Sequence, residues 1–265
     1  NNTYVVLFNI KPSDDFKEGF VILYGPSFSS LKMNKYFFSK SESFEFPNIA
    51  FGNGKWVIVV YQSDIPNKKY KAIIYYTKDL SLLSPHSKDC NILYQCNDGE
   101  KKFYGMNIMY GGGLWVVYGF YYLNNDISHS GIYYFEDPSK GIKNINFDNY
   151  TINWNHKLGY CNGIFFFLAA NKNDRTLYLF YSANPNLNKE NLKIIQLCKE
   201  TIDIDLEIDN YIFLSYNEHK NIIFINFENE STKKIFSICY TPGFSKRIPY
   251  IDSVNRINAY IKASE

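Results

Sequence analysis

A strand–turn–strand pattern that recurs every 48 to 59 residues constrains this chain more than any other feature of its sequence. In residues 48–80, a Gly52-Asn53-Gly54 turn joins two apolar, β-branched and aromatic segments, and a third such segment ends in a turn at Asp79. The turn residues tolerate the positive φ angles that a tight β-hairpin needs. A repeat of about this length is typical of propeller blades and other stacked units.

Four copies of the opening strand align on one polar position each. The first three copies also carry an aromatic residue eight positions further on, at Trp56, Trp115 and Phe165. The four aligned polar residues are Asn48, Asn107, Lys157 and Asp205.

The third strand of each unit ends in a short polar turn. Asp and Asn accept hydrogen bonds from the backbone two residues further on, which fixes such turns. We therefore interpret these residues as structural caps, although they resemble a series of catalytic carboxylates. The four Asp and Asn residues at the turns are Asp79, Asp137, Asn184 and Asn229, and Ser27 occupies the position in the first unit.

The third-strand motif occurs five times, whereas the opening strand occurs four times before the end of the chain. Residues 258–265 resemble a fifth opening strand, starting at Asn258, and would complete the first unit. The sequence thus predicts an all-β fold: one domain over 1–265, a five-bladed β-propeller of four-stranded antiparallel blades. The ring would be closed by the C-terminal strand, which removes exposed strand edges. Residues 241–254 either extend the fifth outer strand or begin a partial sixth blade.

The fourth strands are expected between these motifs, at residues 43–46, 91–95, 144–149, 192–197 and 234–238. The longest loops are expected at 11–17, 62–69 and 121–130, and the last two would offer a contact surface.

Composition agrees with a β-rich globular chain and excludes several functions. Aromatic residues make up 18% of the chain, and the formal net charge is +2, so charge alone does not suggest nucleic-acid binding. No apolar run approaches the roughly 20 residues of a membrane span. The chain starts without Met or a signal peptide, which predicts trimming or processing. The compartment is not determined, although three glycosylation sequons favour an extracellular or surface location.

Neither the cysteines nor the histidines indicate a metal or cofactor. Cys90 and Cys96 flank a short segment and would either form a disulfide or remain buried free thiols, and no Cys-x-x-Cys pair occurs. The four histidines lack ligand spacing, so we expect no metal and no cofactor.

The repeats resemble the sialidase-type, Asp-box propeller family over nearly the whole chain. The resemblance lies in the Gly-Asn-Gly-Lys-Trp-Val turn and strand at 52–57 and in the Thr-Lys-Asp turn at 77–79. The Gly and Trp that complete an Asp box are missing. A sialidase would also need three arginines at the hub. This chain contains three arginines in all, Arg175, Arg247 and Arg256, so few arginines remain for such a site.

A second resemblance is to five-bladed glycosidases of the arabinanase and fructosidase type, through Phe46-Pro47-Asn48 and the segment around Asp203. The resemblance implies carboxylates at the hub that flank the sugar bond. Asp203 and Asp205 share one strand face and could both reach the mouth of the channel. Glu45 is assigned to the preceding outer strand.

The hub ring is the candidate binding site, either for a glycan or for a protein partner. Our leading interpretation is a non-catalytic recognition propeller. The alternatives are a glycoside hydrolase that uses Asp203 and Asp205, and a structural subunit of a larger assembly. The residues assigned to binding are Asn48, Asn107, Lys157, Asp205, Asn258, Asp203 and His156.

Overall fold

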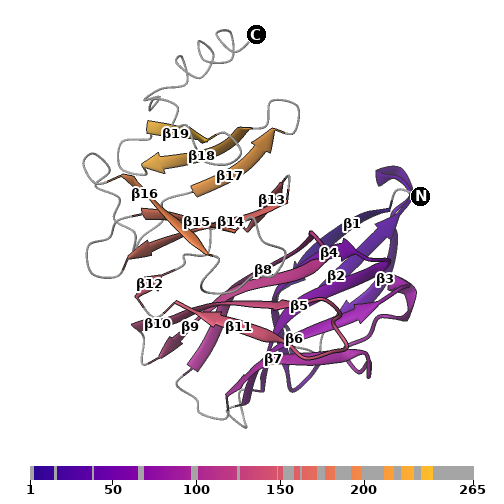
Figure 1. The fold of residues 1–265 in the computed structure, drawn as a ribbon. Helices are drawn as coiled ribbons and strands as arrows, with labels where there is room; N and C mark the ends of the chain where they lie inside the picture. The colour runs from indigo at the N-terminus through magenta and orange to yellow at the C-terminus, as the bar shows by residue number, and fades with distance from the viewer. Residues whose placement is uncertain are drawn as a thin grey trace. The chain divides into compact units, whose positions relative to one another are not determined.

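The protein is built from antiparallel β-sheets, and the described residues of this computed structural model form no α-helix (Figure 1). The structure describes residues 3–14, 17–37, 39–64, 69–96, 101–123, 126–147, 149–151, 158–161, 163–171, 177–182, 192–198, 212–217, 222–229 and 234–240. They divide into two compact units, Asn1–Asp148 and Asn149–Glu265, which we describe separately.

The first unit contains three sheets in chain order. Two short 3₁₀ turns, η1 (Phe28–Ser30) and η2 (Leu80–Leu82), follow the third-strand turns of its first two repeats. The sheets consist of β1 (Tyr4–Ile10), β2 (Gly19–Gly25) and β3 (Lys32–Phe37); of β4 (Ser43–Gly52), β5 (Lys55–Asp64), β6 (Lys69–Thr77) and β7 (Cys90–Cys96); and of β8 (Lys101–Gly111), β9 (Leu114–Leu123), β10 (Asp126–Phe135) and β11 (Lys143–Asn146).

The second unit contains two sheets. In its first sheet, β12 and β13 pair with different parts of β14, so the opening strand is divided into two pieces. The sheets consist of β12 (Tyr150–Thr151), β13 (Gly159–Cys161), β14 (Ile164–Asn171), β15 (Leu177–Ser182) and β16 (Lys193–Cys198); and of β17 (Ile212–Asn217), β18 (Ile222–Asn229) and β19 (Lys234–Tyr240).

The predicted four-stranded, antiparallel arrangement is confirmed for the sheets β4–β7 and β8–β11, in which consecutive strands are neighbours. One strand assignment was wrong. Residues 43–46, expected as the outer strand of the first repeat, belong to β4, and the outer position is taken by β3. The single-domain assignment and the closure of a five-membered ring stay predictions.

The tight turns have the backbone conformation that the sequence predicts. Asn53 and Gly54 adopt φ angles of 46° and 69°, and Gly112 and Gly113 adopt 57° and 86°. Both central residues of a type I′ hairpin turn require positive φ, which matches the right-handed twist of the flanking strands.

An aromatic pair beside each turn shows that the repeats are structurally equivalent. Within each hairpin, the residue paired with the predicted aromatic packs against it at nearly the same distance and tilt. The ring centroids are 4.7 Å apart for Phe51–Trp56, 4.9 Å for Tyr110–Trp115 and 4.6 Å for Tyr160–Phe165, with interplanar angles of 48°, 54° and 50°. The alignment of Trp56, Trp115 and Phe165 is therefore confirmed.

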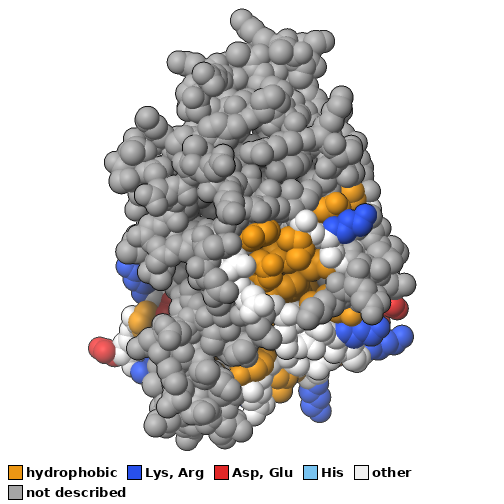
Figure 2. All heavy atoms as spheres, turned by 60° about the vertical axis from the view of Figure 1, so that its left-hand side comes forward, with side chains coloured by type: hydrophobic (Ala, Val, Ile, Leu, Met, Phe, Trp, Pro, Cys, Tyr) orange, Lys and Arg blue, Asp and Glu red, His pale blue; other side chains and the backbone are white. Residues whose placement is uncertain are grey.

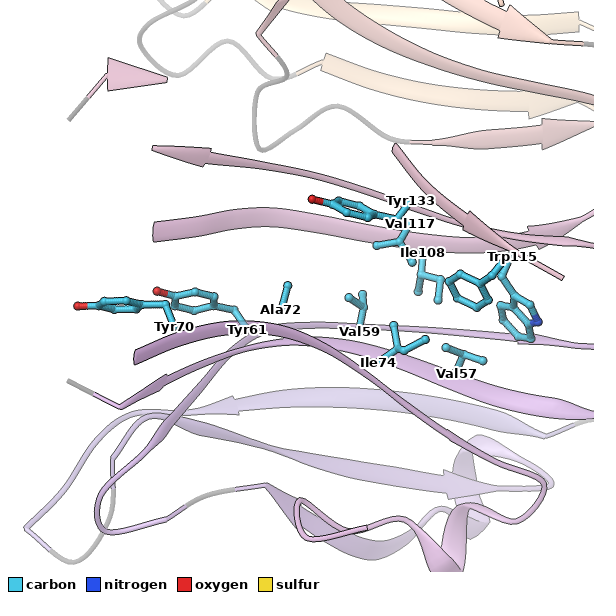
Figure 3. Packing of buried hydrophobic residues seen from close by; sticks show 11 residues of the cluster. Val57, Val59, Tyr61, Tyr70, Ala72, Ile74, Ile108, Trp115, Val117 and Tyr133 are labelled. Carbon is cyan, nitrogen blue, oxygen red and sulfur yellow. The ribbon is translucent and has the colours of Figure 1, made fainter. Parts of the chain in front are cut away.

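The core of the first unit lies between neighbouring sheets, because alternate residues of each strand face opposite sides. In β5, Val57, Val59 and Tyr61 pack with Trp115 and Val117 of β9 (Figure 3), while Ile58 and Val60 pack in a second cluster with Phe20 and Phe37. Full burial of such side chains contributes about 1.5–3 kcal/mol each. Strands buried on both faces explain why the sequence shows continuous apolar runs rather than strict alternation.

The described residues of two expected loops, 62–69 and 121–130, are β-structure. β5 extends to Asp64 and β6 begins at Lys69, while β9 extends to Leu123 and β10 begins at Asp126. Strand pairing thus continues through most of the polar residues of 62–69 and 121–130, because a hairpin arm on a sheet needs no apolar alternation.

Cys90 and Cys96 cannot form a disulfide with each other. They are the first and last residues of β7, and six steps along a strand separate their Cα atoms by about 20 Å. A disulfide tolerates a Cα separation of roughly 4.4–6.8 Å. Cys90 is an exposed free thiol, not a buried one.

Candidate functional site

The sheets of the first unit have two chemically different ends. At one, β4 and β8 turn into β5 and β9 through the glycine turns; we call this the turn end. At the other, Ser43–Glu45 of β4 pair with Tyr61–Ser63 of β5, and we call this the Glu45 end. The carboxyl groups of the two ends make different contacts and are considered in turn.

Asp79 and Asp137 lie at the turn end. The Asp79 carboxylate accepts a hydrogen bond from the backbone N–H of Ser81 at 2.8 Å. Asp137 accepts from the backbone N–H and the hydroxyl of Ser139, at 2.9 and 2.7 Å, and from Lys55 Nζ at 3.0 Å. These are the contacts that the structural-cap interpretation describes, although the Lys55 contact joins two sheets.

The electrostatic surroundings of Asp137 keep its carboxylate ionised. The backbone N–H and the hydroxyl of Ser139, together with the Lys55 ammonium, hold the pKa of Asp137 well below its ordinary value of 3.8. A group with such a low pKa carries no proton to donate at neutral pH, so Asp137 is unsuited to act as a general acid.

Glu45 occupies the other end, on a strand that we did not expect to hold it. It pairs with Tyr61 of β5, whereas Asn48 pairs with Val59, so a β-bulge at Phe46-Pro47 separates the two registers. β8 carries a bulge at the equivalent place, between Tyr104, which pairs with Phe120, and Asn107, which pairs with Tyr118. Bulges re-aim side chains and are over-represented next to active sites.

The Glu45 carboxylate has a direct hydrogen-bond donor. Ser63 Oγ donates to Glu45 Oε1 at 3.3 Å, and Glu45 itself is half-buried. Ser63 is 3% exposed and lies between Ser43 on β4 and Tyr70 on β6, with which it pairs. Tyr61 and Tyr70 stack at 6.1 Å and form one end of the core cluster, with Trp115 at the other end (Figure 3).

The predicted hub residues are only partly described. Asn48 and Asn107 are half-buried and occupy equivalent positions directly after the two bulges, on strands β4 and β8, which pack against each other. Asn229 ends β18 and pairs with Lys234. The remaining predicted positions lie outside the described residues: His156, Lys157, Asn184, Asp203, Asp205 and Asn258.

Sequence reasoning placed Glu45 on the wrong strand because Pro47 suggested a strand boundary. Proline is tolerated within a sheet at an edge strand or at a bulge. Pro47 lies at a bulge, and among the described strands β4 pairs with β5 alone. The 59-residue repeat offered a signal, because it aligns Phe44-Glu45-Phe46 with residues 103–105, directly before Asn107.

Other features of the described residues do not form sites. No group of three or more potential metal-ligating His, Cys, Asp and Glu side chains occurs within the described part of the chain. The helices and turns described there include none long and apolar enough to cross a membrane. Hydrophobic side chains gather in a patch on one face of the molecule, with Lys or Arg near its margin (Figure 2).

Neither a protein-family profile nor a curated protein matches the chain. Solved structures match it at the level of the fold. One is a GH43 β-1,3-galactosidase with galactodeoxynojirimycin, covering 94% of this chain and 91% of that chain at 8% identity and a TM-score of 0.51. Another is the Trypanosoma rangeli sialidase in complex with 2,3-difluorosialic acid, covering 89% of this chain at 8% identity and a TM-score of 0.55. The chain spans 44% of that sialidase. These likenesses support a β-propeller fold of the glycosidase kind.

The comparisons contradict our leading functional interpretation. A non-catalytic recognition module, and hence a protein that is not an enzyme, was the expectation from the missing catalytic sets. The fold that matches nearly the full length of this chain, however, belongs to a galactosidase, and the second match is a sialidase. The glycosidase alternative fits these findings better.

Proposed function

We propose that the protein is a glycoside hydrolase in which Glu45 is one of the two working carboxylates. The observation that carries this proposal is the position of Glu45: half-buried, at a bulge on the first strand of its sheet, with the buried Ser63 hydroxyl donating to it. The fold likeness to the β-1,3-galactosidase supports the reaction class and makes β-galactosides the first substrates to examine.

Glycosidases generally need two carboxyl groups that flank the scissile bond, one protonated and one ionised. Asp203 and Asp205, which the sequence predicts to share one strand face, are candidates for such a carboxyl role. The turn residues Asp79 and Asp137 are excluded because they lie at the opposite end of the strands and are engaged by their own turns. Asn48 and Asn107, next to the bulges, would bind sugar hydroxyls.

We propose five blades, with residues 258–265 completing the sheet of β1–β3. Two facts support this. In the described part of the chain, the sheets β1–β3 and β17–β19 each have three strands. In both, the first described strand corresponds by sequence to the second strand of β4–β7, so an inner strand is needed in each case.

The function is tested with a panel of 4-nitrophenyl α- and β-glycosides and with β-1,3-linked galacto-oligosaccharides. We expect hydrolysis of at least one compound, and we expect Glu45→Gln to lower kcat/KM by about 100-fold or more, as loss of an acid or base typically does. Glu136→Gln is the matched control, because Glu136 is exposed and lies at the turn end. Absence of turnover on the whole panel, or a Glu45→Gln variant as active as Glu136→Gln, would refute the proposal.

A further inference from the structure

We propose that Ser63 is a positioning residue that fixes the Glu45 side chain and stabilises its ionised form, so that Glu45 works as the base or nucleophile. This inference rests on the proposed function and assigns Glu45 one of the two possible roles. Glu45 would then be the carboxylate that acts at the anomeric carbon, and a second carboxyl group would be the general acid.

The first step of the argument is the rigidity of Ser63. It lies on β5, which is paired on both sides, opposite Ser43 of β4 and Tyr70 of β6. With 3% of its surface exposed, its hydroxyl cannot rely on bulk water for hydrogen bonds, and a buried hydroxyl without a partner is unfavourable by about 1–3 kcal/mol. Its bond to Glu45 Oε1 at 3.3 Å satisfies that need.

The second step is the geometry of Glu45. Directly paired residues of neighbouring strands project to the same face of a sheet, so Glu45, Tyr61 and Ser63 share one face. The bulge starts immediately after Glu45, which bends the strand and frees the side chain from the regular ladder. Glu45 therefore needs a specific contact to hold one orientation, and Ser63 provides it.

The third step is that the pair is not part of the repeated architecture. The positions equivalent to Glu45 and Ser63 in the next sheet are Tyr104 and Tyr122, as the 59-residue offset and the common register show. A contact needed by every blade would recur there. The Glu45–Ser63 pair is thus not repeated in the sheet β8–β11, as expected of a residue pair kept for chemistry.

Other ionisable groups lie on the elements that pack against this end of β4. Tyr61 and Tyr70 lie on the same face. Glu18 lies next to Phe44, whose backbone N–H donates to the Glu18 carbonyl at 2.8 Å. By sequence and register, the groups near this end also include Glu42, Asp64, Lys69, Lys71, Lys101, Lys102 and Tyr104. Ser63 is a donor that the described structure places on the carboxylate.

The chemical consequence follows from the direction of the bond. A hydroxyl that donates to a carboxylate stabilises the ionised form over the protonated form. Glu45 either takes a proton from an attacking water or itself bonds the anomeric carbon, and water later releases the sugar. In both mechanisms, the general acid protonates the leaving-group oxygen while the bond between that oxygen and the anomeric carbon breaks. One water is consumed per glycosidic bond.

The test compares Ser63→Ala with Ser63→Thr, which restores the hydroxyl, and with Ser43→Ala as the matched control. Ser43 is 5% exposed and lies directly across from Ser63. The pH dependence of kcat/KM is measured on the substrate found above. In addition, ¹³C-carboxyl NMR follows the titration of Glu45, assigned by comparison with Glu45→Gln, and thermal melts confirm folding.

In Ser63→Ala we expect the acidic limb of the pH profile, and the NMR midpoint of Glu45, to move to higher pH by about 0.5 unit, since the 3.3 Å bond is longer than a strong O–H···O bond. Ser63→Thr and Ser43→Ala should keep the parent midpoint. An unmoved NMR midpoint in a folded Ser63→Ala variant overturns the inference. Failure of the proposed function is distinguishable, because the NMR midpoint would move in a protein that hydrolyses nothing.

Discussion

Two acidic side chains, Glu45 and Asp137, show how the same chemistry acquires different roles at the two ends of one unit. Asp137 accepts three hydrogen bonds, two from its own turn and one from Lys55, 82 residues away in sequence. Glu45 accepts a hydrogen bond from a neutral hydroxyl, that of Ser63. The Asp137 contact ties the sheet β8–β11 to the start of β5, so its effect should be on stability rather than on catalysis.

We expect Asp137→Asn to lower the free energy of unfolding at pH 7 by about 1 kcal/mol, since the ion pair is partly exposed and screened by solvent. The folded-state pKa of Asp137 lies below the unfolded value. The stabilisation is therefore complete above the unfolded pKa and is lost as the pH falls from there through the folded pKa. Urea unfolding of both proteins at pH 7, 5 and 3 should show a difference that shrinks at the lowest pH.

Glu136→Gln provides the control, because Glu136 is the exposed neighbour of Asp137. It should unfold like the parent protein at all three pH values. A difference between Asp137→Asn and the parent that stays constant down to pH 3 would mean that the carboxylate's charge does not matter.

At the scale of elements, the first strands pack so closely that a glycine is required. A Cβ added at Gly52 would overlap the Tyr110 ring of β8, and Tyr110 cannot retreat because it packs on Trp115 at 4.9 Å. We expect Gly52→Ala to destabilise the protein by about 1–3 kcal/mol, the usual range for overpacking. Chemical denaturation of Gly52→Ala, Tyr110→Ala and the double variant measures the coupling between the two sites.

We expect Gly52→Ala to lower the free energy of unfolding by less than half as much in the Tyr110→Ala background as in the parent protein. Gly54→Ala is a suitable comparison, because it meets no atom within 4 Å but has a φ of 69°. It should cost about 1 kcal/mol through backbone strain, and that cost should not depend on Tyr110. Equal costs of Gly52→Ala in both backgrounds would exclude the ring overlap as its cause.

Most of the strand order could be predicted from the sequence because it depends on local chemistry. The Gly-Asn-Gly turn, the aromatic residues eight positions after the aligned polar residue, and the Asp79 cap act within a few residues. The path of β4 through Pro47 and the contact between Lys55 and Asp137 could not, because they depend on a register shift and on a neighbouring sheet. For the same reason Glu45 was considered from the sequence but was assigned to the preceding outer strand instead of β4, so it was left out of the predicted site.

At the scale of the whole molecule, closure of the proposed ring decides whether the first strand of the chain remains an open edge. β1 pairs with β2 on one side only, within the part of the chain that the structure describes. Tyr4 and Phe8 on this strand are 39% and 51% exposed. An open edge with apolar side chains invites pairing with another chain. A closing strand from residues 258–265 would protect it.

Deletion of residues 258–265 tests this closure directly. In an antiparallel edge strand, alternate amides point away from the existing partner, so a closing strand would protect the half of the β1 amides that β2 does not. We expect hydrogen exchange of these amides to become at least about ten-fold faster after the deletion, while exchange along β5, which is paired on both sides, changes less. Deletion of residues 263–265 alone should have a smaller effect, because most of the closing strand remains. If exchange along β1 is the same in both truncated proteins and the parent, the C-terminal strand does not close the ring.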